Sequence, residues 1–204
     1  MPQPGMSRAA RALQAVMAEN TDTQTRPIRT LVLGGGCFWC LDALYREVRG
    51  VTEVTSGYTG GRTPRPTYES VCSGRTGHAE AVRVSFDESV VPASVILDMF
   101  FAMHDPTTLN RQGYDVGTQY RSAVFAASER DAEDFEAARE RAAGLWEDPI
   151  VTALEPLGPF FEAEAVHQNY YAEFPDAGYC QVIVNPKLSK ARRAFEDWIR
   201  PQPA

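Results

Sequence analysis

The segment GGGCFWC, residues 34–40, constrains this chain more than any other stretch. It follows the apolar run TLVL, which predicts a buried strand that ends in a glycine turn. The three glycines let the backbone turn sharply because they carry no Cβ. Helical spacing of the apolar residues that follow, with a stop at Gly50, predicts a helix beginning near Cys37.

A cysteine at the start of a helix has a chemical role open to it. The unpaired N–H groups and the helix dipole favour negative charge there, and the thiolate is the reactive form of cysteine. We therefore expect the pKa of Cys37 to be lowered and the residue to act as a nucleophile. Phe38 and Trp39 beside it indicate a small apolar pocket that suits a methyl group.

Cys40 completes a C-x-x-C spacing, which leaves two other chemistries open. One is a thiol–disulfide exchange site that uses both cysteines. The other is a metal site, whose remaining ligands would have to be Cys72, His78 or Cys180, at spacings that match no common zinc pattern. The sequence holds no dinucleotide, flavin or Walker motif, so we expect no bound metal or cofactor.

Length and charge narrow the class of protein. A chain of 204 residues suits one domain, and we expect residues 1–27 to be a flexible N-terminal extension and residues 28–200 a single catalytic domain. The net charge of −7 argues against nucleic-acid binding. No apolar run approaches the roughly 20 residues that span a bilayer, and no signal peptide is evident. Four cysteines are too few for a disulfide scaffold, so we expect a cytoplasmic protein.

The remaining elements predict an α+β fold, because strands alternate with helices and some strands follow one another. Strands are expected over 51–58, 80–87, 118–126 and 150–157, with a further strand after Cys180 in QVIV. Helices are expected over 92–103, 128–143, 162–171 and 187–199. Two long loops, 61–80 and 104–117, are rich in turn residues and are expected to carry function.

Five blocks of the sequence together resemble the methionine sulfoxide reductase A family. They occur in the family's order and span about residues 30 to 180: GGGCFWC, GYTGG (57–61), PTYESVCSGRTGHAEAV (66–82), HDPTTLNRQGYDVGTQYRSAVF (104–125) and HQNYY (167–171). The resemblance implies a two-layer α/β sandwich, with a ferredoxin-like core, a mixed sheet and long loops. It also implies reduction of the S epimer of methionine sulfoxide, free or in proteins, which repairs oxidative damage.

The resemblance also implies the roles of individual residues. Cys37 takes the place of the nucleophile, and Phe38 and Trp39 take the places that hold the substrate's methyl group. Glu80, in GHAE, takes the place of the acid that protonates the sulfoxide oxygen. Three further residues match positions that bind or organise around that oxygen: the hydroxyl donors Tyr68 and Tyr120, and the carboxylate of Asp115.

These roles are chemically reasonable. A sulfoxide oxygen leaves only after protonation, so attack on the sulfur needs a proton donor. Glu80 can supply that proton near neutral pH only if burial raises its pKa. Tyrosine hydroxyls fixed beside the oxygen stabilise the charge that develops there.

The recycling step is less defined. Oxygen transfer leaves Cys37 as a sulfenic acid, which condenses with a second thiol. Cys180, in FPDAGYC, stands where the family often carries that thiol, and the disulfide would then be reduced by thioredoxin, or by dithiothreitol in vitro. The ordered run after Cys180 departs from the glycine-rich tail of many relatives. Cys40 or an external thiol therefore stays open as the resolving group.

Several alternatives remain. His78, His104 and His167 are expected to hold loops by hydrogen bonds, with His167 also able to line the site, and Cys72 is expected to pack without a chemical role. We expect a monomer. Two other functions are a general dithiol–disulfide oxidoreductase that uses the C-x-x-C pair, and a non-catalytic module that binds methionine sulfoxide.

Overall fold

The computed structural model describes residues 28–201, so the N-terminal extension expected over residues 1–27 lies outside the described residues. A six-stranded sheet forms the centre, in the order β7-β6-β1-β3-β2-β8. Strands β6 and β7 pair in parallel, and the other neighbours are antiparallel. The strands are β1 (Ile28–Gly35), β2 (Val51–Thr59), β3 (Ala79–Asp87), β6 (Ser122–Ala126), β7 (Ala153–Pro156) and β8 (Phe161–Glu162).

The four central strands have ferredoxin-like topology. Helix α2 (Phe38–Arg46) connects β1 to β2, and α4 (Ala93–Met103) lies between β3 and β6. The resulting order β6-β1-β3-β2 corresponds to chain order 4-1-3-2, as in two interlocked β-α-β units. The α+β fold expected from the sequence, with its mixed sheet, is therefore confirmed.

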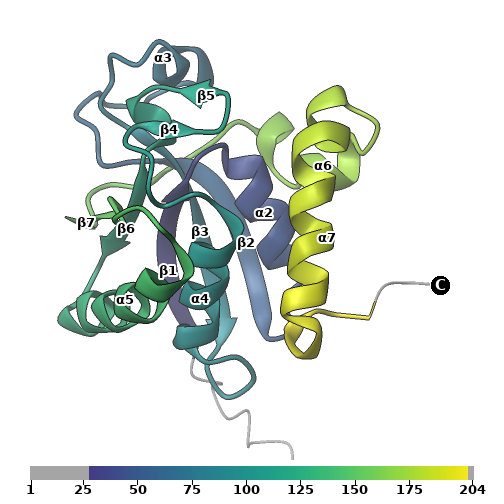
Figure 1. Ribbon diagram of the computed structural model, residues 1–204. Coiled ribbons are helices and arrows are strands. Elements are labelled where there is room, and N and C mark those ends of the chain that lie inside the picture. Colours follow the sequence, from purple (N-terminus) through teal and green to yellow (C-terminus); the bar gives the residue numbers. More distant parts are fainter. Residues whose placement is uncertain (1–27, 202–204) are drawn as a thin grey trace, which may run out of the picture.

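The helices form a second layer on one face of this sheet (Figure 1). Helix α5 (Glu129–Ala142) and helix α7 (Asn185–Ala194) join α2 and α4 there. Alternate strand residues, among them Leu31, Leu33, Val82 and Val84, face the helices and form the main core. The opposite face carries a smaller cluster around Val32, Ala81 and Phe125, against which Leu157 and Phe160 pack.

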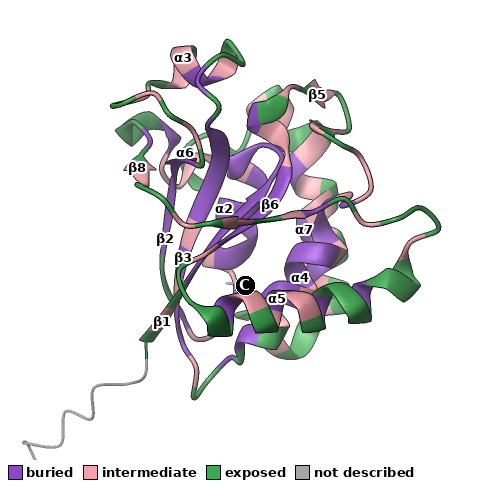
Figure 2. Cartoon of the chain, turned by 90° about the vertical axis from the view of Figure 1, so that its left-hand side faces the viewer, coloured by how far each residue is buried: buried purple, intermediate pink, exposed green. Residues whose placement is uncertain are grey.

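Burial follows this two-layer arrangement. The central strands and the inner sides of the helices are buried, whereas the outer side of α5 is exposed (Figure 2). No helix within residues 28–201 is long and apolar enough to cross a membrane.

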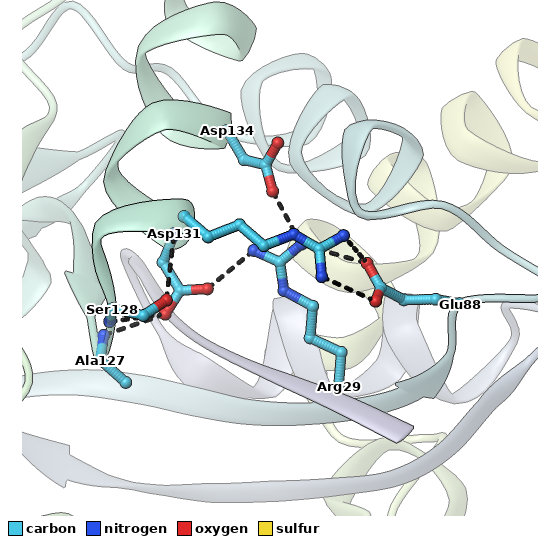
Figure 3. Close-up of polar contacts among 7 residues, drawn as sticks. Arg29, Glu88, Ala127, Ser128, Asp131 and Asp134 are labelled. Carbon is cyan, nitrogen blue, oxygen red and sulfur yellow. Dashed lines mark hydrogen bonds and ion pairs between the residues drawn. The ribbon is translucent and has the colours of Figure 1, made fainter. Parts of the chain in front are cut away.

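The N-terminus of α5 is anchored to the start of β1. Ser128 caps the helix in a reciprocal hydrogen-bond pair with Asp131. Figure 3 shows how Arg29 then contacts Asp131 at 2.7 Å, Asp134 at 2.7 Å and Glu88 at 3.1 Å. This network lies at the end of β1 opposite to Cys37, so it fixes the layers without entering the glycine turn.

The helix expected over residues 162–171 is wrong. That segment contains β8, a 3₁₀ turn η3 (Ala165–His167) and a short helix α6 (Tyr170–Glu173). Asn169 adopts a positive φ of 52°, which interrupts any continuous helix. The Gln168 side-chain amide instead accepts from the Ser56 N–H and donates to the Ser56 C=O, so it gives these two backbone groups a partner at the edge of β2.

The strand expected in QVIV is also wrong. Residues Cys180–Val184 form a π-helical turn, η4, which continues directly into α7. The buried residues Cys180, Val184 and Leu188 recur every four positions, and this helical spacing outweighs the β-branched composition. Pro186 is tolerated because it occupies the first turn of α7.

Two expected segments are refined rather than replaced. The loop over 61–80 contains a short helix, α3 (Tyr68–Cys72), which Thr67 and Ser70 cap reciprocally. The strand expected over 118–126 begins only at Ser122, after the 3₁₀ turn η1 (Thr118–Tyr120). The loop over 104–117 carries a small hairpin of β4 (Arg111–Gln112) and β5 (Asp115–Val116).

Candidate active site

Cys37 is the residue that directly precedes α2. It occupies the N-cap position, directly after β1 and the glycine turn, and only 8% of it is exposed. Gly36 adopts a φ of 89°, and the Gln112 side chain packs on it so closely that any Cβ would overlap. The glycine turn therefore serves both the sharp bend and the docking of the β4–β5 hairpin beside Cys37.

Glu80 lies under the same helix terminus. It shares the helix-facing side of β3 with Val82 and Val84, and it is 1% exposed. Its Oε2 accepts a hydrogen bond of 3.0 Å from the backbone N–H of Phe38. Burial raises the pKa of Glu80 to about 8. The hydrogen bond from the Phe38 N–H lowers the pKa and the charge of Asp115 raises it, but both effects are smaller than that of burial. The carboxyl group is therefore mostly protonated at neutral pH.

The pKa of Cys37 moves in the direction opposite to our expectation. Burial raises it well above the usual value, and the nearby Glu80 and Cys40 raise it further. The Tyr179 hydroxyl and the Trp39 N–H act in the other direction, as expected at a helix N-terminus, but the loss of hydration outweighs them. Cys37 is thus a neutral thiol beside a mostly neutral acid at neutral pH.

An aromatic cluster forms around the two residues that follow Cys37. The Phe38 and Trp39 rings both face His167, at centroid distances of 5.6 Å and 5.7 Å, and Tyr68 lies 4.3 Å from the same imidazole. Tyr170 stacks on Trp39 at 3.8 Å. Aromatic rings therefore surround Phe38 and Trp39, and the role of these two residues in holding a methyl group stays a prediction.

Two buried polar atoms belong to this aromatic cluster. Trp39 Nε1 and His167 Nδ1 have no hydrogen-bond partner within residues 28–201. Buried polar groups are nearly always paired, so these two atoms are exceptions among the described residues.

The hydroxyl groups of Tyr68 and Tyr120 lie near the Glu80 carboxyl group. Burial and the charge of Glu80 raise both pKa values, so both hydroxyls stay protonated donors. Glu164 fixes the start of α3, since it accepts a hydrogen bond of 2.8 Å from the Tyr68 N–H. Burial raises the pKa of the nearby Cys72 thiol, and the Tyr68 and Tyr120 hydroxyls lower it, so Cys72 lies closer to these two residues than a packing role suggests.

Two residues missed by the sequence interpretation complete the site. The Tyr179 hydroxyl donates to Asp115 at 2.9 Å, and its presence near Cys37 and Cys40 lowers the pKa of both thiols, against the larger effect of burial. Lys187 of α7 places its ammonium 3.7 Å from the Cys40 sulfur. Tyr179 directly precedes Cys180, which gave the only sequence signal for it; nothing in the sequence pointed to Lys187.

Cys180 lies apart from this group. It is fully buried in η4 among core residues, and burial is the cause that raises its pKa. Of the sequence-predicted residues, the structure groups Cys37, Phe38, Trp39, Glu80, Tyr68, Tyr120 and Asp115.

The other histidines have structural hydrogen bonds. His78 accepts from the Gly61 N–H and contacts the Thr63 carbonyl oxygen, while His104 bonds Phe100 O and Ser122 Oγ. Within residues 28–201 no group of three or more His, Cys, Asp or Glu side chains is arranged to hold a metal ion.

Comparison with known sequences agrees across most of the chain. The family model described as "Peptide methionine sulfoxide reductase" matches residues 29–199. The peptide methionine sulfoxide reductase MsrA of Paenarthrobacter aurescens is 65% identical over 172 residues, covering 84% of this chain and 99% of its own length. The MsrA of Clavibacter sepedonicus is 53% identical over 173 residues, covering 85% and 99%.

Solved structures give the same relationship. Reduced Mxr1 from Saccharomyces cerevisiae has a TM-score of 0.71 at 35% identity, covering 75% of this chain and 89% of its own. Methionine sulfoxide reductase A of Corynebacterium diphtheriae has a TM-score of 0.68 at 36% identity, covering 76% and 78%. Mxr1 in complex with Trx2 has a TM-score of 0.51 at 26% identity, covering 70% and 84%.

A buried thiol at a helix terminus, beside a protonated acid and two hydroxyl donors, defines a thiol-dependent oxidoreductase. The sequence and structural matches extend well beyond these residues. The chain belongs to the peptide methionine sulfoxide reductase A (MsrA) family, and it is an enzyme that reduces methionine sulfoxide.

Proposed function

We propose that this enzyme reduces the S epimer of methionine sulfoxide, in proteins and as the free amino acid, with Cys37 as nucleophile and Glu80 as acid. The observation that carries the proposal is the position of the Glu80 carboxyl. It is buried, mostly protonated near pH 7, and 3.0 Å from the N–H of the residue after Cys37. A proton donor is what a sulfoxide oxygen needs in order to leave.

The aromatic cluster around Phe38 and Trp39 supports a single orientation of the substrate. The methyl group lies between Phe38 and Trp39, and the oxygen faces Glu80, Tyr68 and Tyr120. Hydroxyls already held near the acid stabilise the oxygen without reorganisation. Asp115 acts indirectly: it accepts from Tyr179 and raises the pKa of Glu80.

The chemical step transfers one oxygen atom. The Cys37 sulfur attacks the sulfoxide sulfur while Glu80 protonates the oxygen, and the thiol proton returns to Glu80. The protonated oxygen then moves to Cys37 as the S–O bond of the substrate and the new S–S bond break, which leaves a sulfenic acid on Cys37 and releases methionine as a thioether. The substrate sulfur gains two electrons and Cys37 loses two, so no further reductant is needed until recycling.

Recycling requires a second thiol to displace water from the sulfenic acid. Cys180 was the resolving thiol expected from the sequence, and its burial in η4 means that this turn must open before it reaches Cys37. Three observations support Cys40 as a second candidate. Cys40 lies one helical turn along α2, the Tyr179 hydroxyl lowers the pKa of both thiols, and the Lys187 ammonium favours the Cys40 thiolate.

The electron donor that we propose is thioredoxin, with dithiothreitol sufficient in vitro and no bound cofactor. The related Mxr1 has been solved in complex with Trx2, which supports this choice. We also propose a monomer that acts in the cytoplasm. The four cysteines are free, as suits a reducing compartment.

The test is turnover of the separate R and S epimers of methionine sulfoxide with dithiothreitol, comparing wild type with Cys37→Ser. We expect reduction of the S epimer alone and its complete loss in the variant. Turnover that survives in Cys37→Ser would remove Cys37 from the role of nucleophile. Reduction of protein disulfides that depends on Cys40 would instead indicate a general dithiol oxidoreductase.

A further inference from the structure

A groove of about 480 Å³ adjoins the active site on the side of α7. One wall is the turn of the β4–β5 hairpin, and the other is η4 with the first turn of α7. These segments lie about 70 residues apart in the chain, so the groove exists only in the folded protein.

The groove is apolar and open to solvent. Tyr114, at the tip of the hairpin, is 92% exposed, and Val182 on the facing turn is 70% exposed. Ile183 lies beside Val182 on the same wall. Soluble proteins rarely leave apolar side chains gathered in this way unless the surface binds something.

The groove is continuous with the catalytic residues. Asp115 and Tyr179 line it and also hydrogen-bond to each other, and the Tyr179 hydroxyl lies close enough to Cys37 to lower the pKa of that thiol. A molecule in the groove therefore lies against two residues that belong to the active site.

We propose that this groove binds the polypeptide on either side of the oxidised methionine, through apolar side chains next to it. This inference rests on the proposed function. Only two methylene groups separate the sulfur of methionine from its Cα, so a sulfoxide at Cys37 brings its own backbone against Asp115 and Tyr179. The chain that continues from that backbone then runs along Tyr114, Val182 and Ile183.

The charges of the groove fit a polypeptide of varied sequence. Lys187 and Asp115 contribute one positive and one negative charge, so the walls favour neither acidic nor basic segments. Contact with apolar side chains then supplies the selectivity, and a methionine near other apolar residues is the preferred target.

The test compares two peptides that contain S-methionine sulfoxide, one flanked by leucines and one by serines, together with free methionine sulfoxide. Wild type, Tyr114→Ser and Val182→Ser are assayed with dithiothreitol. We expect the preference for the leucine peptide over the serine peptide, measured as the ratio of kcat/KM values, to fall about tenfold in each variant. Leu145→Ser is the matched control, since Leu145 is 68% exposed and lies on η2 (Ala143–Leu145), away from the groove.

A binding measurement separates this inference from the proposed function. Fluorescence anisotropy of the labelled leucine peptide is measured against Cys37→Ser, with and without Val182→Ser, and needs no turnover. Weaker binding in the double variant supports the groove even if the chemistry is different. An unchanged peptide preference overturns the inference, as does a rise in KM for thioredoxin alone, which would make the groove the site of the reductant.

Discussion

The Glu80 carboxylate oxygen lies 3.0 Å from the backbone nitrogen of Phe38, the first residue of α2. This hydrogen bond connects the sheet layer to the helix layer at the place where Cys37 begins the helix. It also opposes the rise in the pKa of Glu80, although burial outweighs it. The Phe38 N–H, which has no partner within the helix, therefore holds the Glu80 carboxyl group in position.

Methionine formation in a single turnover should slow as the pH rises through about 8. Glu80 has a pKa of about 8, and above that pH it has lost the proton that it would donate to the sulfoxide oxygen. Glu80→Gln should lower the rate roughly 100- to 10,000-fold and remove this decline. Glu69→Gln, at an exposed position of α3, is the control and should keep the wild-type profile. A wild-type rate that keeps rising to pH 10 would show that ionisation of the thiol controls the step instead.

The same substitution should make the protein more stable. The folded-state pKa of Glu80 is raised above its unfolded value of 4.5, so the folded state binds the extra proton between pH 4.5 and about 8. Stability from this group is therefore present below pH 4.5 and is lost as the pH rises through about 8. The stability of Glu80→Gln has no such pH dependence. At pH 8 its free energy of unfolding, measured in urea, should exceed that of wild type by about 2 kcal/mol or more. Equal stability of the two proteins at pH 5 and pH 8 would contradict a raised pKa.

Loss of the Tyr179 hydroxyl should make Cys37 less reactive. The hydroxyl favours the Cys37 thiolate, so Tyr179→Phe should raise the thiol pKa further and slow alkylation by iodoacetamide about tenfold at pH 7.4. Peptide mapping identifies the modified cysteine. Tyr171→Phe is the control, since its hydroxyl bonds Asn185 instead. Alkylation of Cys37 at the wild-type rate in Tyr179→Phe would show that burial alone sets its reactivity.

The resolving thiol can be found by counting free thiols after one turnover without reductant. Wild type should lose two thiols per methionine formed. If Cys40 resolves Cys37, Cys40→Ser should stop at a sulfenic acid that dimedone traps, while Cys180→Ser still forms the disulfide. The reverse pattern would return the role to Cys180 and would require η4 to open. Disulfide formation in both variants would point to an external thiol or to Cys72.

Arg29→Met should destabilise the protein without changing its chemistry. The substitution leaves the buried Asp131 and the nearby Glu88 without their shared partner, and we expect a loss of about 2 to 3 kcal/mol by urea unfolding. Arg130→Met is the matched control, because its ion pair with Glu88 is exposed and should contribute less than about 1 kcal/mol. A similar loss in both variants would mean that the Arg29 network acts only through surface charge.

The fold and much of the site could be predicted because their signals are local. The strand, glycine turn and helix around Cys37 follow one another along the chain, and period-two alternation places Glu80 on the same face as Val82 and Val84. The errors fall where tertiary contacts decide. Gln168 turns back to the edge of β2, so residues 162–171 do not form a helix. Four-residue spacing in the core makes Cys180 helical although its neighbours favour strands.

The rest of the site depends on distant segments. Tyr179 and Lys187 reach the two thiols only because η4 and α7 pack beside α2, about 140 residues further along the chain. The raised pKa of Cys37 has the same origin, since the local helix terminus favours the thiolate and the surrounding fold removes its water.

The last described residues are fastened to the end of α2 that lies away from Cys37. Arg200 N–H donates to Glu47 O at 2.7 Å, and Val48 pairs with Ile199. Lys187, in the first turn of α7, lines the peptide groove, whereas Ile199 and Arg200 lie beyond the other end of that helix. A solid support coupled at Arg200 or Pro201 would therefore be attached away from the groove, as a sensor for oxidised protein would require.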